Sequence, residues 1–449
     1  MNRVIVSALL VLVSRVHPAA AQEPVPTDSL MQSYMRGLAD STDAWYGATV
    51  APLDTTGLDS ALVAGLAAGP QGGRRGPRRN PVSLSNTPAL GFNRADGGQL
   101  GVSSTLSLPR GVRVAGRLQY TTGTHDWLGD GKLMRSFRVP NVPGRLEWSA
   151  AAGRWTEPFD RDFYSPTLVT IAALTTGSDR HDYLRRDGFR SALAWVGRDA
   201  MASLEWRDQL ESALPFTTDW TLFGGDPELL TNAQAFTARV RELGLAAHGR
   251  IPGTRFNVGG RYWTSGSATG SDLIYRRLRL EAGGDVSLGR HFALVTQSTY
   301  GRLRGQAVPQ DAFFLGGVHS LRTLERNEFT GTGHAFARAD VVLVDDLPRL
   351  LHLPVPAWLP LQASVFAASG ALWGTSGTGH TALETRRDLP RASEWRSEAG
   401  AGLAWRPGIP NPQTLIRFEY AWPIGPDARE PKFTFAIQRY LDLVPLLKD

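Results

Sequence analysis

The 449-residue chain contains no cysteine, so disulfide bonds are excluded as a source of stability. It also has no run of 18 consecutive apolar residues, and its apolar stretch Val4–Val13 is only ten residues long. A transmembrane helix is therefore not predicted. Stability must come from a packed core or from a closed β-sheet.

Sequence signatures of catalysis are missing as well. There is no Gly-x-Ser-x-Gly elbow, and Gly374–Gly379 (GTSGTG) lacks the lysine of a phosphate-binding loop and is interpreted as a turn. The nine histidines show no spacing typical of a metal site. The formal charge of +6 comes from arginines that are scattered rather than clustered. The sequence predicts no enzyme, no cofactor, no metal site and no nucleic-acid partner.

The N-terminus indicates export. Arg3 precedes the apolar run, and Ala19–Ala21 offers a small-residue cleavage site, so residues 1–21 are predicted to be a secretory signal peptide. Residues 22–85 have weak periodicity and end near the Gly/Pro/Arg-rich stretch Gly69–Pro81. We expect them to be a largely irregular periplasmic extension, followed by a second unit at 86–449.

Residues 86–449 alternate between apolar and polar side chains over segments of about ten residues, with 13 Trp and 48 Gly in the chain. Short turns alternate with longer loops. This pattern is typical of an outer-membrane barrel. We predict an all-β fold, a transmembrane antiparallel β-barrel of about 16 strands, with 14 or 12 strands as alternatives. Side chains expected to face lipid are Trp148, Trp206, Phe418, Tyr420, Trp422, Phe433 and Phe435.

Two segments need separate predictions. In 236–241, Phe236, Ala238 and Val240 are expected to face lipid, and Arg239 and Arg241 to face the lumen. Asp345–Trp358 is a long connection on the side of the short turns, and an interfacial helical turn is the one structure we suggest for it.

The longest loop, Gly305–Gly333, contains FFLGGVHSLRTL at Phe313–Leu324, with a bend at Gly316 and Gly317 and a single arginine, Arg322, among uncharged neighbours. We expect this loop to fold into the lumen. A guanidinium in a partly dry lumen favours a carboxylate partner. By strand parity the inward-facing acids nearby are Asp340, Glu398 and Glu419, of which Glu419 or Glu398 is the preferred partner.

The same loop resembles the lumen loop of the BamA-like outer-membrane assembly and translocation barrels, the bacterial surface-antigen superfamily. That family has Leu-Gly-Gly followed by Val-Arg-Gly-aromatic, and here 321–324 read Leu-Arg-Thr-Leu, which keeps only the arginine. The family's inward Asp in Phe-x-Asp-x-Gly is replaced by Ala368. PALGFNRADG near residue 90 and a C-terminal aromatic signal also match, the latter at Phe433, Phe435, Ile437 and Tyr440.

The resemblance implies a bacterial outer-membrane protein that takes part in membrane protein insertion or polypeptide translocation, in contact with lipid and with unfolded client proteins or periplasmic partners. Relatives usually carry periplasmic POTRA modules, and residues 22–85 are too short to match them. Two alternatives stay open: a pore for polar solutes, and a structural barrel without a transport role.

Overall fold

A computed structural model of the chain describes residues 82–439, apart from 140–143, 160–169, 171–172, 175–178, 180, 198, 221–234, 307, 318–319, 356–359, 375–387, 406–413 and 426–428. The expected signal peptide and nearly all of the expected extension at 22–85 lie outside the described residues.

The described residues form one antiparallel sheet of 16 strands in which each strand pairs with its neighbours in chain order, and a small second sheet, β12–β13, inserted after β11. The predicted all-β class and the predicted number of strands are confirmed. The strands are β1 Ser83–Asn93, β2 Gly97–Leu108, β3 Val112–Thr121, β4 Trp127–Phe137, β5 Arg145–Pro158, β6 Tyr183–Val196, β7 Ala200–Ala213, β8 Ala238–Arg250, β9 Asn257–Ser265, β10 Tyr275–Leu288, β11 Phe292–Gly305, β12 Phe313–Leu315, β13 Phe329–Gly331, β14 Gly333–Leu343, β15 Leu361–Trp373, β16 Trp395–Trp405, β17 Thr414–Ile424 and β18 Lys432–Arg439.

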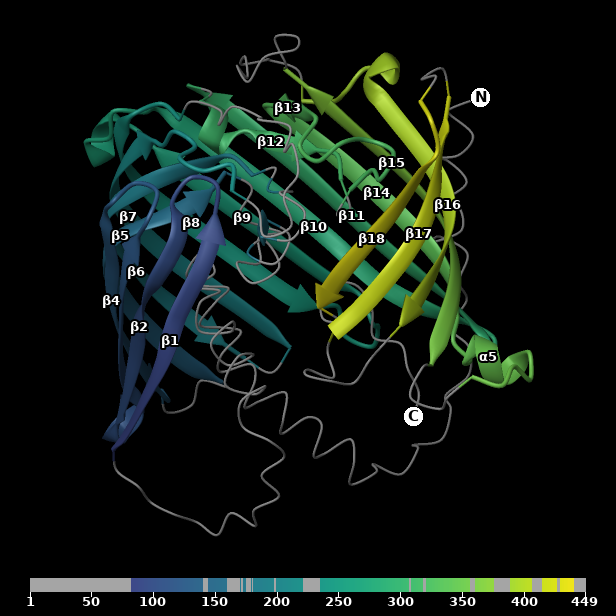
Figure 1. The fold of residues 1–449 in the computed structure, drawn as a ribbon, viewed down its shortest axis with the longest axis horizontal. Coiled ribbons are helices and arrows are strands. Elements are labelled where there is room, and N and C mark those ends of the chain that lie inside the picture. The colour runs from purple at the N-terminus through teal and green to yellow at the C-terminus, as the bar shows by residue number, and fades with distance from the viewer. Residues whose placement is uncertain are drawn as a thin grey trace.

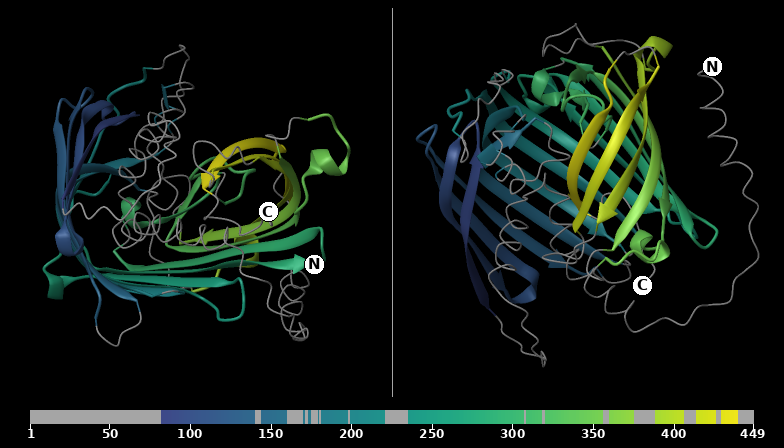
Figure 2. Two further views of the ribbon diagram at one scale, coloured as in Figure 1. Left: turned by 90° about the horizontal axis from the view of Figure 1, so that it is seen from below. Right: turned by 45° about the vertical axis from the view of Figure 1, so that its right-hand side comes forward.

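The sheet curves around a central space, as Figures 1 and 2 show. Strands of 8 to 14 residues, tilted across the wall, have the length that a membrane-spanning strand needs. Among the described residues no ladder joins the first strand, β1, to the last, β18. The wall therefore has a seam between these two edge strands.

The two faces of the sheet differ in polarity. The seven aromatic side chains predicted to face lipid lie on the outer face, and several are strongly exposed, including Phe433 at 61% and Trp422 at 45%. The opposite positions are polar and buried, as Arg417 at 5% and Glu419 at 1% illustrate. An apolar outside with a polar inside is the arrangement that a bilayer requires of a barrel.

The orientation expected for the start of β8 is wrong. Ala238 and Val240 are buried, at 4% and 3% exposure, inside the largest apolar cluster, whereas Arg239 faces outward and binds Asp208 on β7. Arg241 binds the same carboxylate at 3.1 Å. Apolar residues can face inward here because this part of the lumen is filled by the loop and is dry.

That cluster is where the loop meets the wall. Leu315, Leu321 and Leu324 from the loop are at most 2% exposed, and they pack on inward-facing residues of the wall that include Leu303, Phe336, Ala368 and Leu372. Each buried leucine contributes about 1.5–3 kcal/mol. The loop therefore has an apolar core of its own, which fixes its polar residues in place.

Connections at the end of the barrel where the turns are short include two single-turn elements. The first, η1, spans Pro109–Gly111, and α5, spanning Leu347–Leu350, lies in the long connection between β14 and β15. Further 3-10 turns are η2 Ser267–Thr269, η3 Pro309–Asp311 and η4 Ala392–Glu394. In the part of the chain that the structure describes, no helix is long and apolar enough to cross a membrane.

The candidate lumen-loop site

The bend at Gly316 and Gly317 sets the path of the loop. Their φ angles are +128° and +93°, a conformation that side chains other than hydrogen rarely adopt. A Cβ at Gly316 would lie 2.0 Å from the carbonyl oxygen of Glu325. The bend is closed by Gly316 N–H donating to Ser320 Oγ at 2.8 Å and Gly317 N–H donating to the Leu321 carbonyl at 3.0 Å. These contacts bring Arg322 to the wall.

Arg322 is buried, at 2% exposure, and its Nε donates a hydrogen bond to Glu419 on β17. Its Nη1 lies 3.9 Å from Glu398 Oε1 on β16. Burial, and then repulsion by Arg338, lower the pKa of Arg322 to about 10, so the guanidinium is still charged at neutral pH. The structure thus brings Arg322 together with both of its preferred partners.

Two further arginines complete a charge cluster on the wall. Arg338 on β14 and Arg417 on β17 each place Nη2 2.7 Å from Glu419 Oε1. Both also contact Asp340 on β14, Arg338 through Nε at 2.6 Å and Arg417 through Nη2 at 2.9 Å. With Arg322, three arginines face the three carboxylates of Asp340, Glu398 and Glu419, so the cluster is neutral.

Asp340 therefore binds the wall arginines rather than Arg322. Phe366 on β15 lies beneath the cluster, with its ring centroid 3.9 Å from the Arg338 guanidinium and 5.0 Å from that of Arg322. An aromatic face attracts cations and needs no hydrogen-bond partner. The Phe366 ring therefore covers the two guanidinium groups on a side where they have no carboxylate partner.

Glu398 holds the loop backbone. Its Oε2 accepts hydrogen bonds from Thr323 N–H at 2.9 Å and from Thr323 Oγ1 at 3.0 Å. In the β15–β16 ladder, Glu398 is directly opposite Ala368, the position where the resembling family has its aspartate. The carboxylate of Glu398, on the neighbouring strand, therefore lies in the part of the lumen where the resembling family has its aspartate.

The other end of the loop is fixed to the opposite wall. Gln310 in η3 donates through Nε2 to the Phe236 carbonyl at 2.9 Å and to Glu211 on β7 at 3.2 Å, and its Oε1 accepts from Phe236 N–H at 3.1 Å. Its neighbour Asp311 is also buried. Burial, with repulsion from Glu211 and Glu242, raises the pKa of Asp311 to about 8. This second anchor was not found from the sequence, because nothing in the local pattern pairs η3 with β7.

The tip of the loop contacts the last strand. Glu325 Oε1 lies 2.6 Å from Nζ of Lys432 at the start of β18, and Glu328 lies 2.7 Å from Arg429 just before it. These pairs are partly exposed, so each contributes little energy. They nevertheless tie one edge of the seam to the loop.

The other edge of the seam is held separately. In the turn between β1 and β2, the backbone N–H of Arg94 donates to Asp179 Oδ2 at 3.1 Å, and its side chain donates to the Asp179 carbonyl at 3.0 Å. Arg185 binds Asp96 of the same turn at 3.0 Å, with both side chains at most 2% exposed. The piece PALGFNRADG is therefore a clamped hairpin tip, a role that the sequence did not reveal.

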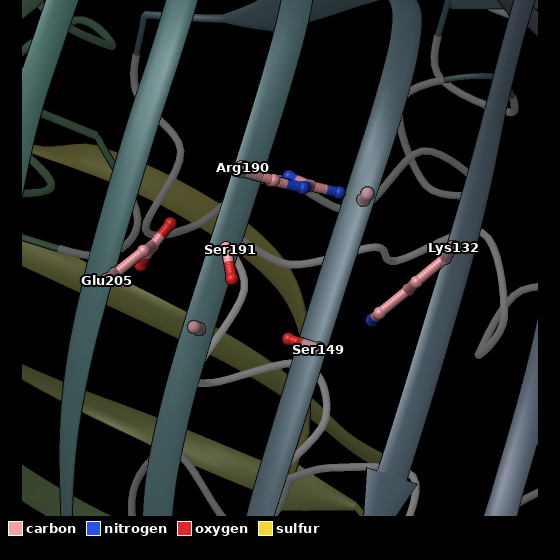
Figure 3. A pocket seen from close by; sticks show the side chains of 7 residues that line it. Lys132, Ser149, Arg190, Ser191 and Glu205 are labelled. Atoms are coloured by element: carbon pink, nitrogen blue, oxygen red, sulfur yellow. The ribbon is translucent and has the colours of Figure 1, made fainter.

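A small pocket in the wall of β4–β7 does not add a ligand site (Figure 3). Its volume of about 10 Å³ is near the space that one water needs. No group of three or more His, Asp or Glu within the described ranges could hold a metal ion. The pocket is lined by Lys132, Ser149, Ala151, Arg190, Ser191, Ala192 and Glu205.

Other residues singled out from the sequence have mixed outcomes. Phe433 and Phe435 lie on β18 and face outward, at 61% and 52% exposure. Ile437 is on β18, but its side chain, like Tyr440 and His319 as a whole, lies outside the described residues.

With the fold and the loop described, comparison with known proteins gives a family match for part of the chain. Residues 252–438, which include the lumen loop and the last strands, match the model of the Omp85 superfamily domain. These residues form an Omp85 superfamily domain. The resemblance to this superfamily seen in the sequence is thereby confirmed. No curated protein sequence matches the chain.

A solved structure shows the same fold. The chain is similar to BamA from Haemophilus ducreyi lacking POTRA domains 1–3, with a TM-score of 0.51 and 14% identity over 80% of this chain and 70% of that one. CdiB from Escherichia coli matches with a TM-score of 0.42 and 13% identity, over 81% of this chain and 63% of that one. CdiB from Acinetobacter baumannii gives 0.40 and 11%, over 80% and 59%. The chain thus spans less than two thirds of either CdiB chain. The fold expected from the sequence, an antiparallel barrel like that of BamA, is confirmed.

Proposed function

We propose that this Omp85-superfamily barrel inserts unfolded β-barrel proteins into the bacterial outer membrane, and that the free edge of β1 is the template for the client. The observation that carries this proposal is the seam: β1 has a full ladder to β2 and none to β18 among the described residues. Export by a signal peptide and residence in the outer membrane are part of the same proposal.

An unpaired edge inside a bilayer needs a partner. Each backbone group left without a hydrogen bond in hydrocarbon costs several kcal/mol. An unpaired edge strand is also a template for another chain's strand. Leu84 and Leu90 on β1 are 65% and 68% exposed, so lipid or a client can reach this edge from the side. A client strand paired with β1 would bond the unpaired backbone groups of this edge. The pairing would also fix the register of the client's first strand.

The loop favours this lateral route over passage through the lumen. It is fixed to one wall by Gln310 and to the opposite wall by Arg322, so it crosses the central space. Because the hairpin tip of β1 is clamped by Asp179 and β18 is tied through Lys432, the two seam edges are attached to different parts of the barrel. They can therefore separate without breaking a shared ladder. An anchored loop of this kind also disfavours a free pore.

The test uses the full chain in liposomes and an unfolded outer-membrane barrel polypeptide as client. Client folding is followed by the gel mobility shift between folded and heat-denatured barrel. We expect the client to fold at least about tenfold faster than in empty liposomes. Equal rates, with solute conductance through the purified protein, would contradict insertion and support a pore.

A variant locates the template edge. Pro88 lies on β1, and proline in an edge strand is tolerated where its missing N–H faces away from the ladder. Since N–H groups of residues two apart point the same way, Leu90→Pro removes one more donor from the free edge and leaves the β2 ladder intact. It should slow client folding several-fold, the range set by one hydrogen bond of about 0.5–1.5 kcal/mol. Leu90→Ala is the matched control and should fold clients at the parent rate.

A further inference from the structure

The connection between β14 and β15 presents apolar side chains to the outside at the short-turn end of the barrel. Leu350, Leu351 and Leu353, in and just after α5, are 51%, 57% and 50% exposed. Of this connection, residues 344–355 and 360 are described. Three neighbouring leucines that are half exposed are unusual on a surface that meets only water.

The turn that carries these leucines is rigid. Leu353 N–H donates to the Pro348 carbonyl at 2.9 Å, and His352 N–H donates to the Arg349 carbonyl at 3.2 Å. Together with the φ of +53° at His352, this is the Schellman arrangement that ends helices. Leu350 and Leu351 N–H groups are bonded within the same turn. A turn whose backbone is satisfied internally can enter a low-dielectric region at little cost.

The charges of the connection are arranged for an interface. Asp345 binds His291 in the neighbouring turn, and Asp346 Oδ1 accepts from Leu361 N–H at 3.1 Å, so both acids are held against the barrel. Arg349, on the same turn as the leucines, has a side chain that is 77% exposed, with its Nε 3.5 Å from Asp346 Oδ2. A long basic side chain beside apolar ones suits the boundary between headgroups and acyl chains.

The position of α5 indicates that lipid, and not a partner protein, contacts these leucines. In Figure 1, and in Figure 2 seen from below, α5 projects outward beyond the ring of strands, away from the lumen opening. It continues the apolar outer face of the neighbouring strands, where Phe292 and Val365 are 47% and 56% exposed. A partner that delivered clients would be expected beneath the lumen or at the seam, and α5 is at neither place.

We propose that α5 and Leu351–Leu353 anchor the barrel in the periplasmic leaflet by inserting Leu350, Leu351 and Leu353 into the lipid interface beside β14 and β15. The anchor rests on the membrane-embedded barrel of the proposed function, but not on client insertion. It fixes the tilt of the wall on the side of the barrel that carries the Arg322 cluster. Lipid is thus bound at α5 as well as along the apolar outer face of the strands.

Because the chain has no cysteine, single-cysteine labelling tests this directly. Leu351→Cys, labelled with an environment-sensitive fluorophore, is placed in phosphatidylethanolamine and phosphatidylglycerol vesicles with nitroxide-bearing lipids or with iodide. We expect nitroxide placed near the headgroups to quench this label at least threefold more than iodide does. Arg290→Cys, in the exposed turn next to it, is the matched control and should show the reverse.

A third label separates failure of the anchor from failure of the barrel. Leu280→Cys lies on the outer face of β10, where Leu280 is 45% exposed, and should be quenched by nitroxide deep in the acyl chains. If Leu280 behaves so while Leu351 is quenched by iodide, α5 lies in water and the anchor is wrong. If Leu351 is protected from both quenchers, a protein covers it and lipid is the wrong partner. If Leu280 is quenched by iodide, the membrane-embedded barrel itself fails.

Discussion

Replacing Arg322 by alanine is expected to release the lumen loop while the barrel stays folded. Arg322 and its partners Glu398 and Glu419 are at most 2% exposed, so little water screens them. Without Arg322 the cluster has two arginines against three carboxylates, a net charge of −1. Removing one partner of a buried pair costs about 3–5 kcal/mol. The population with an undocked loop should therefore rise roughly 150- to 5,000-fold, at tenfold per 1.36 kcal/mol.

The assay uses Ser320→Cys as a reporter, and each variant is compared with Ser320→Cys alone, because this substitution weakens the bond from Gly316 N–H to the same extent in all of them. Ser320 is 9% exposed, so its thiol should react with a maleimide only when the loop opens, and the labelling rate then follows the undocked population. Arg322→Lys should recover little, because an ammonium lacks the planar fork of the guanidinium. Lys432→Ala is the control. It breaks a partly exposed pair, with side chains 34% and 55% exposed, and should change the rate only a few-fold at most.

The pairing is tested by a double-mutant cycle. Glu419→Gln alone leaves three arginines against two carboxylates and should also raise the labelling rate. Because both substitutions disturb the same cluster, combining them should cost much less than the sum of the two. Additive effects, or a change below about threefold for Arg322→Ala, would refute the reasoning. The loop would then be held by its apolar residues and by its other polar contacts, those of Gln310 and Thr323, and not by Arg322.

Three further results are expected. The pKa of Asp311, raised from 3.8 to about 8 by burial, means that the docked loop keeps a proton that the released loop gives up, so docking is strongest below about pH 4 and weakens up to about pH 8. Channel-opening frequency should rise by up to about tenfold per pH unit in that window, and Asp311→Asn should weaken this dependence. Arg94→Ala should speed hydrogen exchange in the β1–β2 turn, because a buried bond to the Asp179 carbonyl is lost; an unchanged exchange rate would exclude a contribution of the Arg94 side chain to the clamp. Gly400→Ala would place a Cβ 2.4 Å from the Phe366 ring and should destabilise the barrel by about 1–3 kcal/mol in urea unfolding, whereas at Gly131 nothing lies within 4 Å and alanine should be neutral.

Much of the fold could be predicted because strand patterning is local. Alternation at Phe418, Glu419 and Tyr420 fixes which side chain faces the lumen, and the same parity places Glu419 and Glu398 near an inward loop. Arg338 and Arg417 could not be assigned to Arg322's cluster in this way. Their meeting depends on the register of four strands, from β14 to β17, which no local pattern determines.

The error at β8 has a physical cause. The alternation rule assumes a wet lumen, and it therefore turned Ala238 and Val240 toward lipid. The lumen beside them is filled by Phe313, Leu315 and other apolar residues of the cluster. Likewise, the contacts of Gln310 with Glu211 and of Arg94 with Asp179 join segments 99 and 85 residues apart, and side-chain identity alone does not reveal such pairs.

The central claim, that the free edge of β1 receives a client strand, is tested most directly by cross-linking. A photoreactive group is attached to Leu90→Cys on β1 or, as a matched control, to Leu245→Cys on the outer face of β8, where Leu245 is 52% exposed. Both sites meet lipid, but only the first lies at the seam. During client folding, the account predicts cross-links from residue 90 to one terminal strand of the client and background levels from residue 245. Equal cross-linking at both positions, or none at residue 90 while clients fold, would contradict it.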